Sequence, residues 1–333
     1  MDVCDVTTAT GAKFEAKAGE SMLDAALRNG VVLPYGCRTG RCSTCKCKVS
    51  TGETVALHPE LGLSEDEKTD GWILSCVRGA ITDVALDVED LGDTELFPPK
   101  TLPSRIESMD LLADDVVKVM LRLPPTADFR FNAGQYLDVI GPNGVRRSYS
   151  IACGTVHEQK LELHVRRVPG GELSDYWFTK AKANDLLRLN GPLGTFFLRD
   201  VTGLDLVFLA TGTGIAPVKA MLEGFRSLAA HKMPKSITVY WGGRVYSDLY
   251  WTPPPMDFEL RYLPTLSRAH DGWDGARGYV HHVCLATSNN LQNAAVYACG
   301  SDAMIQSAHR ELTAAGLPEN RFYSDAFVCS SKT

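Results

Sequence analysis

The sequence lacks a long hydrophobic run, because Gly or Pro interrupts every apolar stretch well before the ~18 residues that span a membrane. The N-terminal segment MDVCDVTTATGAKFEAK also lacks the apolar core of a signal peptide. No basic patch for a nucleic-acid backbone is present, since acids and bases are interspersed and give a net charge of −6. We therefore expect a cytoplasmic protein with small-molecule and protein partners, without nucleic acid or membrane.

Low-complexity tracts and internal repeats are also absent, and the composition of 44% hydrophobic and 22% charged residues is typical of a globular protein. The 333 residues are too many for one compact core, because a domain usually has ~100–200 residues. In a reducing compartment the ten cysteines are not expected to form a disulfide framework. Four of them fall between Cys37 and Cys47, which favours a metal cluster.

Changes in sequence pattern divide the chain into three predicted domains. Residues 1–92 combine short strands with one capped helix, which indicates a small α+β domain. The Pro- and acid-rich residues 93–102 predict an extended linker. Short alternating apolar runs in residues 103–201 predict an antiparallel β-barrel. Strand and helix patterns alternate in residues 202–333, which predicts an α/β domain with a parallel sheet.

The strongest chemical signal is the spacing of four cysteines. Three form a C-x4-C-x2-C motif and the fourth follows after thirty further residues: Cys37, Cys42, Cys45 and Cys76. This is the ligand spacing of a plant-type [2Fe–2S] cluster. A structural zinc site is the alternative, but zinc sites usually pair two short C-x2–4-C hairpins and this loop offers one. Cys47 lies in a predicted strand beyond the motif, and we interpret it as a packing residue.

The stretch PYGCRTGRCSTCKCKV, together with the later LSCV, resembles the ferredoxin domain of multicomponent oxygenase reductases and related flavoproteins. The resemblance implies that residues 1–92 form a β-grasp ferredoxin domain whose four cysteines bind a [2Fe–2S] cluster.

The predicted barrel contains an R-x-Y-S motif after a strand and a turn, formed by Arg147, Ser148, Tyr149 and Ser150. In this setting the motif resembles the flavin-binding motif of the ferredoxin–NADP reductase superfamily. Arginine suits a pyrophosphate, the tyrosine ring can stack on a flavin, and a serine hydroxyl can approach the flavin N5. The resemblance therefore makes these four residues flavin ligands and gives Ser150 a catalytic role.

A second piece of the flavin site is expected at the barrel's one predicted helix. Gly171 and Ser174 lie at its start, where free backbone N–H groups and the helix dipole can hold a phosphate. In the resembling superfamily this helix start binds the pyrophosphate, and the preceding strand, which carries His164 and Val165, accommodates an extended FAD. The alternative interpretation is that Gly171 belongs to an ordinary turn and that Ser174 is an ordinary residue of a helix start.

A glycine turn opens the predicted α/β domain after the apolar strand LDLVFLA, and its residues are Thr211, Gly212, Thr213, Gly214 and Pro217. A turn between strand and helix can bind the pyrophosphate of a dinucleotide. Proline stands where the usual fingerprint has its third glycine, and this G-x-G-x-x-P form resembles the nicotinamide-nucleotide turn of the same superfamily.

Two later segments resemble the superfamily's hydride-transfer site. Cys299 and Gly300 belong to a C-G-x-x-M element, which places a cysteine beside the nicotinamide. The terminal FYSDAF resembles the last strand of the family, where an acid and an aromatic residue approach the flavin; these are Asp325 and Phe327. The resemblance makes Cys299 and Asp325 catalytic residues, although burial in the core explains Phe327 equally well.

The choice between NADH and NADPH is poorly determined by the residues. The second strand of the α/β domain ends without an acid for the ribose hydroxyls, and Arg244, Ser267 and Arg268 could accept a 2′-phosphate. The most similar family members use NADH, so NADH is expected, with NADPH possible.

Three modules in this order predict an NAD(P)H-dependent reductase that passes electrons from NADH through FAD and the [2Fe–2S] cluster to a redox partner protein. Segments such as RRSYSIA, GPLGTFFLRD and YACGSDAMI resemble the reductases that serve CDP-4-keto-6-deoxyglucose 3-dehydrases in 3,6-dideoxysugar synthesis. The alternative is the reductase component of a Rieske-type ring-hydroxylating oxygenase, because both families share the modules. A redox-sensing carrier without nucleotide turnover is a third possibility, which intact flavin and nucleotide motifs disfavour.

Overall fold

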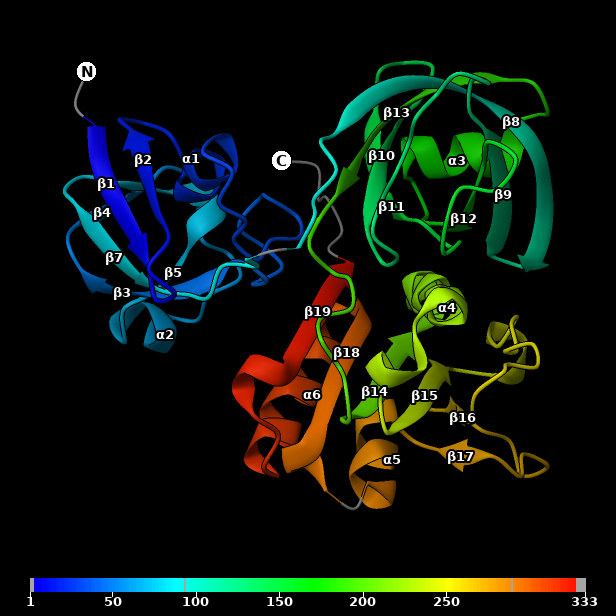
Figure 1. Ribbon diagram of the computed structural model, residues 1–333. Helices are drawn as coiled ribbons and strands as arrows, with labels where there is room; N and C mark the ends of the chain where they lie inside the picture. The colour runs from blue at the N-terminus through cyan, green and yellow to red at the C-terminus, as the bar shows by residue number, and fades with distance from the viewer. Residues whose placement is uncertain (1–2, 93, 289, 328–333) are drawn as a thin grey trace. The chain divides into compact units, whose positions relative to one another are not determined.

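The structure of the chain is a computed structural model that describes residues 3–92, 94–288 and 290–327 (Figure 1). These residues form two compact units, one ending at Glu95 and one running from Leu96 to Phe327. The first unit has one hydrophobic core, whereas the second has two, one in its barrel and one in its α/β sheet. No helix in the described ranges is both long and apolar enough to cross a membrane.

The first unit has the predicted α+β fold. Its five-stranded sheet has the order β2-β1-β7-β3-β5, in which β1 and β7 pair in parallel and the other neighbours pair antiparallel. Strands β4 and β6 form a separate antiparallel pair. The elements are β1 (Val3–Thr8), β2 (Lys13–Lys17), α1 (Met22–Arg28), β3 (Lys46–Thr51), β4 (Thr54–Ala56), α2 (Glu65–Thr69), β5 (Trp72–Leu74), β6 (Arg78–Ala80) and β7 (Val84–Asp87).

Helix α1 positions the loop that carries three of the four motif cysteines. The Ser21 hydroxyl caps the helix by accepting a hydrogen bond from the Asp24 N–H at 3.1 Å. Met22 and Leu23 are fully buried, so the first turn of the helix anchors it to the core. Gly30 adopts a φ of +77°, a left-handed conformation that ends the helix and turns the chain into the cysteine loop.

The second unit begins with the predicted antiparallel barrel. Its strand order is β11-β10-β13-β8-β9-β12, and a bridge between Ile151 and Leu163 links the two edge strands and closes the sheet. Strand β8 begins at Lys100, inside the range expected as a linker. The elements are β8 (Lys100–Ala113), β9 (Val116–Arg122), β10 (Tyr136–Ile140), β11 (Arg146–Ser150), β12 (Lys160–Arg166), α3 (Glu172–Thr179) and β13 (Leu186–Leu193).

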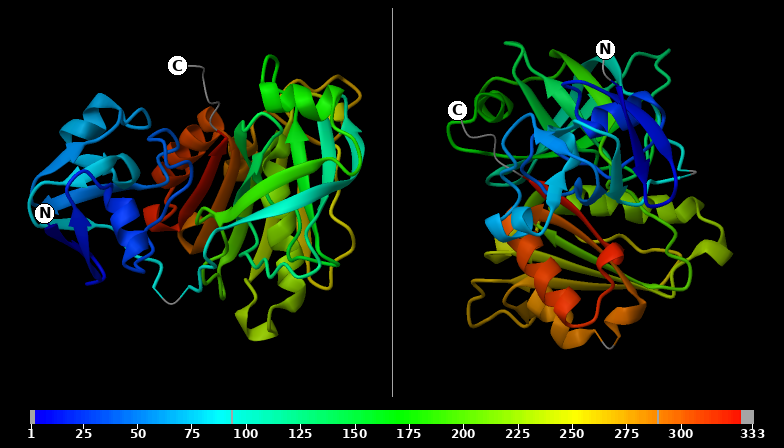
Figure 2. Two further views of the ribbon diagram at one scale, coloured as in Figure 1. Left: turned by 90° about the horizontal axis from the view of Figure 1, so that it is seen from above. Right: turned by 90° about the vertical axis from the view of Figure 1, so that its left-hand side faces the viewer.

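The rest of the second unit is the predicted α/β domain, with a six-stranded, fully parallel sheet of order β17-β16-β15-β14-β18-β19. Helix α4 covers one face of the sheet, and α5 and α6 cover the other (Figure 2). The elements are β14 (Asp205–Thr211), α4 (Ile215–Gly224), β15 (Ser236–Gly243), β16 (Leu260–Leu266), β17 (Ala276–Arg277), α5 (Val280–Thr287), β18 (Ala294–Ser301), α6 (Asp302–Ala314) and β19 (Phe322–Phe327).

The order of the parallel strands creates a binding position at one edge of the sheet. After β14 the chain adds β15, β16 and β17 on one side, and it then returns to place β18 on the other side of β14. The connections that follow β14 and β18 therefore leave the carboxyl edge in opposite directions. Ligands of open α/β sheets bind in the crevice at such a switch point. Both predicted nucleotide segments, after β14 and at the end of β18, lie there.

Candidate iron–sulfur, flavin and nucleotide sites

The first unit brings the four motif cysteines together. The Cys37 and Cys42 side chains form one hydrogen-bonded pair, and those of Cys45 and Cys76 form another. The backbone N–H of Cys37 donates to the Cys42 sulfur at 3.2 Å, and that of Thr39 donates to the Cys37 sulfur at 3.4 Å. The hydrogen bond between the Cys37 and Cys42 side chains lowers the pKa of Cys37 and raises that of Cys42, so the pair shares one proton and holds one thiolate.

The surroundings of the cysteines fit an iron–sulfur cluster. A Cβ atom at Gly36 would lie 3.1 Å from the Cys42 sulfur, so a side chain there would crowd the sulfurs. Gly40 has a φ of +72°, and a Cβ atom there would lie 2.5 Å from the Pro59 carbonyl oxygen. Four soft thiol ligands with backbone N–H donors on the sulfurs are the donor set of a [2Fe–2S] protein.

Cys47 is separated from this group by its position in β3. It pairs with Ile73 of β5, and only 1% of its surface is exposed within the hydrophobic core. Burial raises the pKa of its thiol to about 12. A protonated thiol among apolar side chains is consistent with the predicted packing role.

The R-x-Y-S motif occupies β11, and the structure holds each of its polar side chains differently. The Ser148 hydroxyl donates to Asp138 on the neighbouring strand at 2.6 Å. The Tyr149 hydroxyl accepts a hydrogen bond from the Trp177 indole at 3.1 Å, and the two rings meet edge to face. Arg147 is exposed, and its guanidinium donates to a backbone carbonyl of the same strand. The tyrosine ring is thus fixed while the arginine stays accessible to a phosphate.

The start of helix α3 fits a phosphate group. Gly171 is its N-cap and no side chain caps the helix, so first-turn N–H groups are available to an anion. The preceding Gly170 has a φ of +72°, which turns the chain into the helix. The Ser174 hydroxyl accepts a hydrogen bond from the Val168 N–H at 2.6 Å, so its side chain is used to hold this turn. Its role toward FAD remains a prediction that depends on backbone contact.

The glycine turn after β14 packs directly against the end of β18. A Cβ atom at Gly214 would lie 2.2 Å from the Cys299 carbonyl oxygen, and one at Gly300 would lie 2.1 Å from the Thr211 hydroxyl oxygen. Gly300 also has a φ of +146°. Only glycine permits this close approach of the two segments at the switch point. Helix α4 begins immediately afterwards and contains the predicted Pro217 in its first turn.

Two of the predicted catalytic residues, Ser150 and Cys299, lie near the carboxylate of the third, Asp325, and the three come from three different strands. The Ser150 hydroxyl lies 3.5 Å from the Asp325 Oδ2 atom, and the Cys299 sulfur lies 3.9 Å from the same atom. Cys299 is fully buried. The pKa of the Cys299 thiol is raised well above its ordinary value, mainly by burial and to a smaller extent by the nearby Asp325. Cys299 therefore lies beside this carboxylate as a neutral thiol. Phe327, at the end of the same last strand, is 39% exposed and thus accessible to a flavin ring.

Comparisons with known proteins match these sites domain by domain. The family model of the 2Fe-2S iron-sulfur cluster binding domain matches residues 7–78, that of the oxidoreductase FAD-binding domain matches residues 103–198, and that of the oxidoreductase NAD-binding domain matches residues 208–310. The chain is also 39% identical over 325 residues to the CDP-6-deoxy-L-threo-D-glycero-4-hexulose-3-dehydrase reductase of Yersinia pestis, a match that covers 96% of this chain and 97% of the relative. The chain belongs to the family of iron–sulfur flavoprotein reductases.

Two further relatives support the same assignment. The reductase is 32% identical over 327 residues to reductase component 2 of terephthalate 1,2-dioxygenase from Comamonas sp, with 95% of this chain and 94% of the relative covered. Among solved structures, the Amycolatopsis cytochrome P450 reductase GcoB aligns with a TM-score of 0.75 and 28% identity, covering 98% of this chain and 100% of that chain. The chain is therefore an NAD(P)H-dependent oxidoreductase that uses FAD and a [2Fe–2S] cluster, which confirms the predicted fold class and cofactors.

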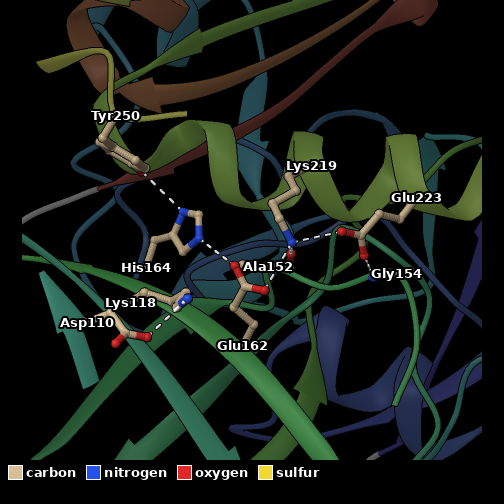
Figure 3. A network of polar contacts seen from close by, with 9 residues as sticks. All are labelled: Asp110, Lys118, Ala152, Gly154, Glu162, His164, Lys219, Glu223 and Tyr250. Atoms are coloured by element: carbon tan, nitrogen blue, oxygen red, sulfur yellow. Dashed lines mark hydrogen bonds and ion pairs between the residues drawn. The ribbon is translucent and has the colours of Figure 1, made fainter. Parts of the chain in front are cut away.

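The side chains of His164 and Val165, in the predicted FAD strand, both make contacts within the protein. The His164 ring bonds Glu162 at 2.8 Å and the Tyr250 hydroxyl at 3.3 Å (Figure 3). Val165 is 1% exposed and belongs to the barrel core. Strand alternation sends these neighbouring side chains to opposite faces, and both are used within the protein. Any contact with FAD at these two positions would have to come from the backbone.

Arg166 is a candidate nucleotide ligand that sequence analysis did not identify. Its Nε and Nη2 atoms are buried without a hydrogen-bond partner among the described residues, although Nε lies 3.2 Å from an Asp115 oxygen as an ion pair. Its Nη1 lies 2.9 Å from where a Cβ atom of Gly212 would stand. Buried unsatisfied cationic donors beside the glycine turn fit the pyrophosphate of a dinucleotide. The sequence could not show this, because the two segments meet only in the folded unit.

The three residues predicted near the 2′ position meet in loops after β15 and β16. The Ser267 N–H donates to the Gly243 carbonyl at 3.0 Å, and the Arg268 N–H donates to the Arg244 carbonyl at 2.9 Å. The Asp248 carboxylate also lies at the end of β15, where it accepts hydrogen bonds from the backbone N–H groups of Arg244 at 2.7 Å and Val245 at 3.3 Å. The sequence pattern did not predict this contact, because a turn of the chain brings Asp248 back to the strand end.

We expect Asp248→Asn to shift the ratio of kcat/KM values toward NADPH by about tenfold, or ~1.4 kcal/mol. The substitution keeps an oxygen acceptor for the two N–H groups but removes the charge that would repel a 2′-phosphate. Steady-state kinetics with both nucleotides measure the ratio, and Asp257→Asn, an exposed acid in the loop before β16, is the control. An unchanged ratio in Asp248→Asn would show that this carboxylate does not select the nucleotide.

Proposed function

We propose that this reductase delivers electrons from NADH to a dehydrase that acts on CDP-4-keto-6-deoxyglucose in 3,6-dideoxysugar synthesis. The observation that carries the proposal is the 39% identity to a hexulose-3-dehydrase reductase over nearly the full length of both chains. The identity to a terephthalate dioxygenase reductase component, at similar coverage, is lower at 32%. NADH is proposed over NADPH because Asp248 places a carboxylate at the end of β15.

In the proposed reaction each unit of the chain has a separate task. The bound FAD would supply the chemistry that links a two-electron hydride donor, NADH, to a one-electron acceptor, the [2Fe–2S] cluster. Arg147 and the α3 start would hold the flavin pyrophosphate, Tyr149 would hold its ring, and the glycine turn with Arg166 would hold the nucleotide. Ser150, Cys299 and Asp325 would shape the pocket for hydride transfer. The protein thus supplies orientation and electrostatics and does not need a residue that transfers protons.

The second candidate function is the reductase component of a Rieske-type ring-hydroxylating oxygenase. The observation that favours it is the match to the terephthalate dioxygenase reductase component, which covers 95% of this chain. Both candidates require the same flavin and cluster sites, so the difference concerns only the protein that accepts the electrons.

Product formation with each acceptor would decide between them. The purified reductase and NADH would be incubated with a CDP-4-keto-6-deoxyglucose 3-dehydrase and its substrate, and separately with an aromatic-ring dioxygenase and its substrate. We expect kcat/KM for product formation with the dehydrase to be at least ~10-fold higher than with the dioxygenase, which corresponds to ~1.4 kcal/mol in favour of that partner. Cytochrome c reduction by the same preparation serves as the control for active reductase. A higher kcat/KM with the dioxygenase would reject the proposal and support the alternative.

A further inference from the structure

A buried polar network connects the barrel to helix α4 within the second unit. The Lys219 ammonium donates to the Ala152 carbonyl oxygen at 2.8 Å, to Glu162 at 3.1 Å and to Glu223 at 2.8 Å (Figure 3). The other Glu223 oxygen accepts a hydrogen bond from the Gly154 N–H at 2.8 Å. Two side chains one turn apart on α4 therefore hold both ends of the segment from Ala152 to Gly154.

The same segment is also packed tightly against the helix backbone. A Cβ atom at Gly154 would lie 2.9 Å from the Glu223 Cβ, 3.0 Å from the Ala220 carbonyl oxygen and 3.1 Å from the Gly224 nitrogen. Real Cβ atoms essentially never lie closer than 3.0 Å to another atom, and the other two distances are tighter than most real Cβ contacts, so a side chain at Gly154 would require the segment or the helix to shift. The close approach sets the distance between this segment and α4, and the ionic contacts of Lys219 and Glu223 maintain that distance.

The network extends into the barrel wall through Glu162. Its second oxygen bonds His164 at 2.8 Å, and His164 in turn contacts the Tyr250 hydroxyl of the α/β domain at 3.3 Å. The Lys219 and Glu162 side chains are 14% and 16% exposed. Burial alone would lower the pKa of Lys219, but the two glutamates outweigh it and raise the pKa, so the ammonium stays charged. The three donors of the ammonium match three acceptors.

The two ends of this connection are the two predicted cofactor sites. Ala152 lies two residues after Ser150, the last residue of the flavin motif, and α4 follows directly after the nucleotide turn that ends at Gly214. We therefore expect a change in the Lys219 contacts to shift one site relative to the other. A misplacement of 1 Å between reacting groups can reduce a rate by roughly 100-fold.

We propose that Lys219, with Glu162 and Glu223, is a positioning residue that fixes the nicotinamide-binding turn at hydride-transfer distance from the flavin-binding strand. The inference rests on the assignment of Arg147–Ser150 and Gly212–Gly214 to the two cofactors. It does not depend on the identity of the electron acceptor, so a failure of the dehydrase proposal leaves it untouched.

The test uses the full-length holoprotein with two variants that disturb the connection by different means. Lys219→Met keeps most of the unbranched side chain but removes its charge and its donors, whereas Gly154→Ala keeps every charge and adds the excluded Cβ atom. Anaerobic stopped-flow reduction of the flavin by NADH gives the limiting rate and the NADH Kd. The long-wavelength absorbance of nicotinamide stacked on flavin reports the geometry before hydride transfer, and the FAD content per chain is measured separately.

We expect both variants to lose about tenfold or more in limiting rate and to lose stacking absorbance, with the NADH Kd changed less than about threefold. Lys219→Arg should recover most of the rate, because it keeps the cation. Lys235→Met, which removes a 67% exposed lysine that lies 3.9 Å from Asp205, should behave as wild type. Wild-type limiting rates in both disturbing variants would overturn the proposal. A rate loss fully accounted for by missing FAD would overturn it too, because the network would then only stabilise the fold.

Discussion

The Cys45→Ala variant is expected to lose its [2Fe–2S] cluster and on the order of 100-fold in NADH-dependent cytochrome c reduction, while NADH still reduces its flavin at the wild-type rate. Cys45 is 5% exposed, and its thiol pairs with that of Cys76, which comes from a separate turn of the chain. Removing this sulfur leaves three ligands for a cluster that needs four. Flavin reduction should persist, because the flavin and nucleotide residues belong to the second compact unit.

A matched control lies two residues further along the chain. Cys47→Ala removes a thiol that is 1% exposed and packed in the core of the same unit. It should cost about 1 kcal/mol of stability but retain two iron atoms and two labile sulfides per FAD. Iron, sulfide and FAD analysis, with cytochrome c and stopped-flow assays on the same preparations, would check both variants. A cluster that survives in Cys45→Ala, or one that is absent from a folded Cys47→Ala, would show that the ligands are assigned wrongly.

Sequence patterns predicted the parts of the sites that are local in the chain. The cysteine motif places three sulfurs on one loop, and the R-x-Y-S residues share one strand, so their chemistry could be stated before the fold was known. The glycine turn was also predictable, because Gly212 and Gly214 stand between an apolar strand and a helix. In each case the residues are close in the sequence, so their relative positions in the fold follow from the local structure.

The features that escaped prediction all join segments that are distant in sequence. Arg166 meets the glycine turn across the border between barrel and sheet, and Lys219 meets Ala152 sixty-seven positions away. Asp248 returns to the strand end through a turn whose path the residue pattern does not specify. His164 shows the converse, since its family motif was visible but its side chain is held by Glu162 and Tyr250. Such contacts depend on which strands become neighbours, and periodicity does not determine that choice.

The Asp325→Asn variant should lower the limiting rate of flavin reduction by roughly 100-fold, with the NADH Kd changed less than about threefold. Asp325 lies on the last strand, 3.5 Å from the Ser150 hydroxyl and 3.9 Å from the Cys299 sulfur. Its carboxylate orients the hydroxyl that faces the predicted flavin position, and the neutral amide would reverse or lose that hydrogen bond. Ser150→Ala should reproduce most of the loss, and the double variant should be little worse than either single one. Additive losses would show that the two residues act independently.

The pH dependence of the same rate tests the state of the third residue in this pocket. The pKa of Cys299 is raised far enough by burial and by Asp325 that its thiol keeps its proton in the folded protein. Raising the pH through the ordinary thiol range near 8.5 should therefore ionise no group at this position, and the limiting rate should show no thiolate limb between about pH 6 and 9. Cys299→Ala should give the same profile, shifted at most in amplitude. If wild type showed a limb near pH 8.5 that Cys299→Ala lacked, the cysteine would ionise during catalysis, and the pocket would have to be more open to water than its complete burial indicates.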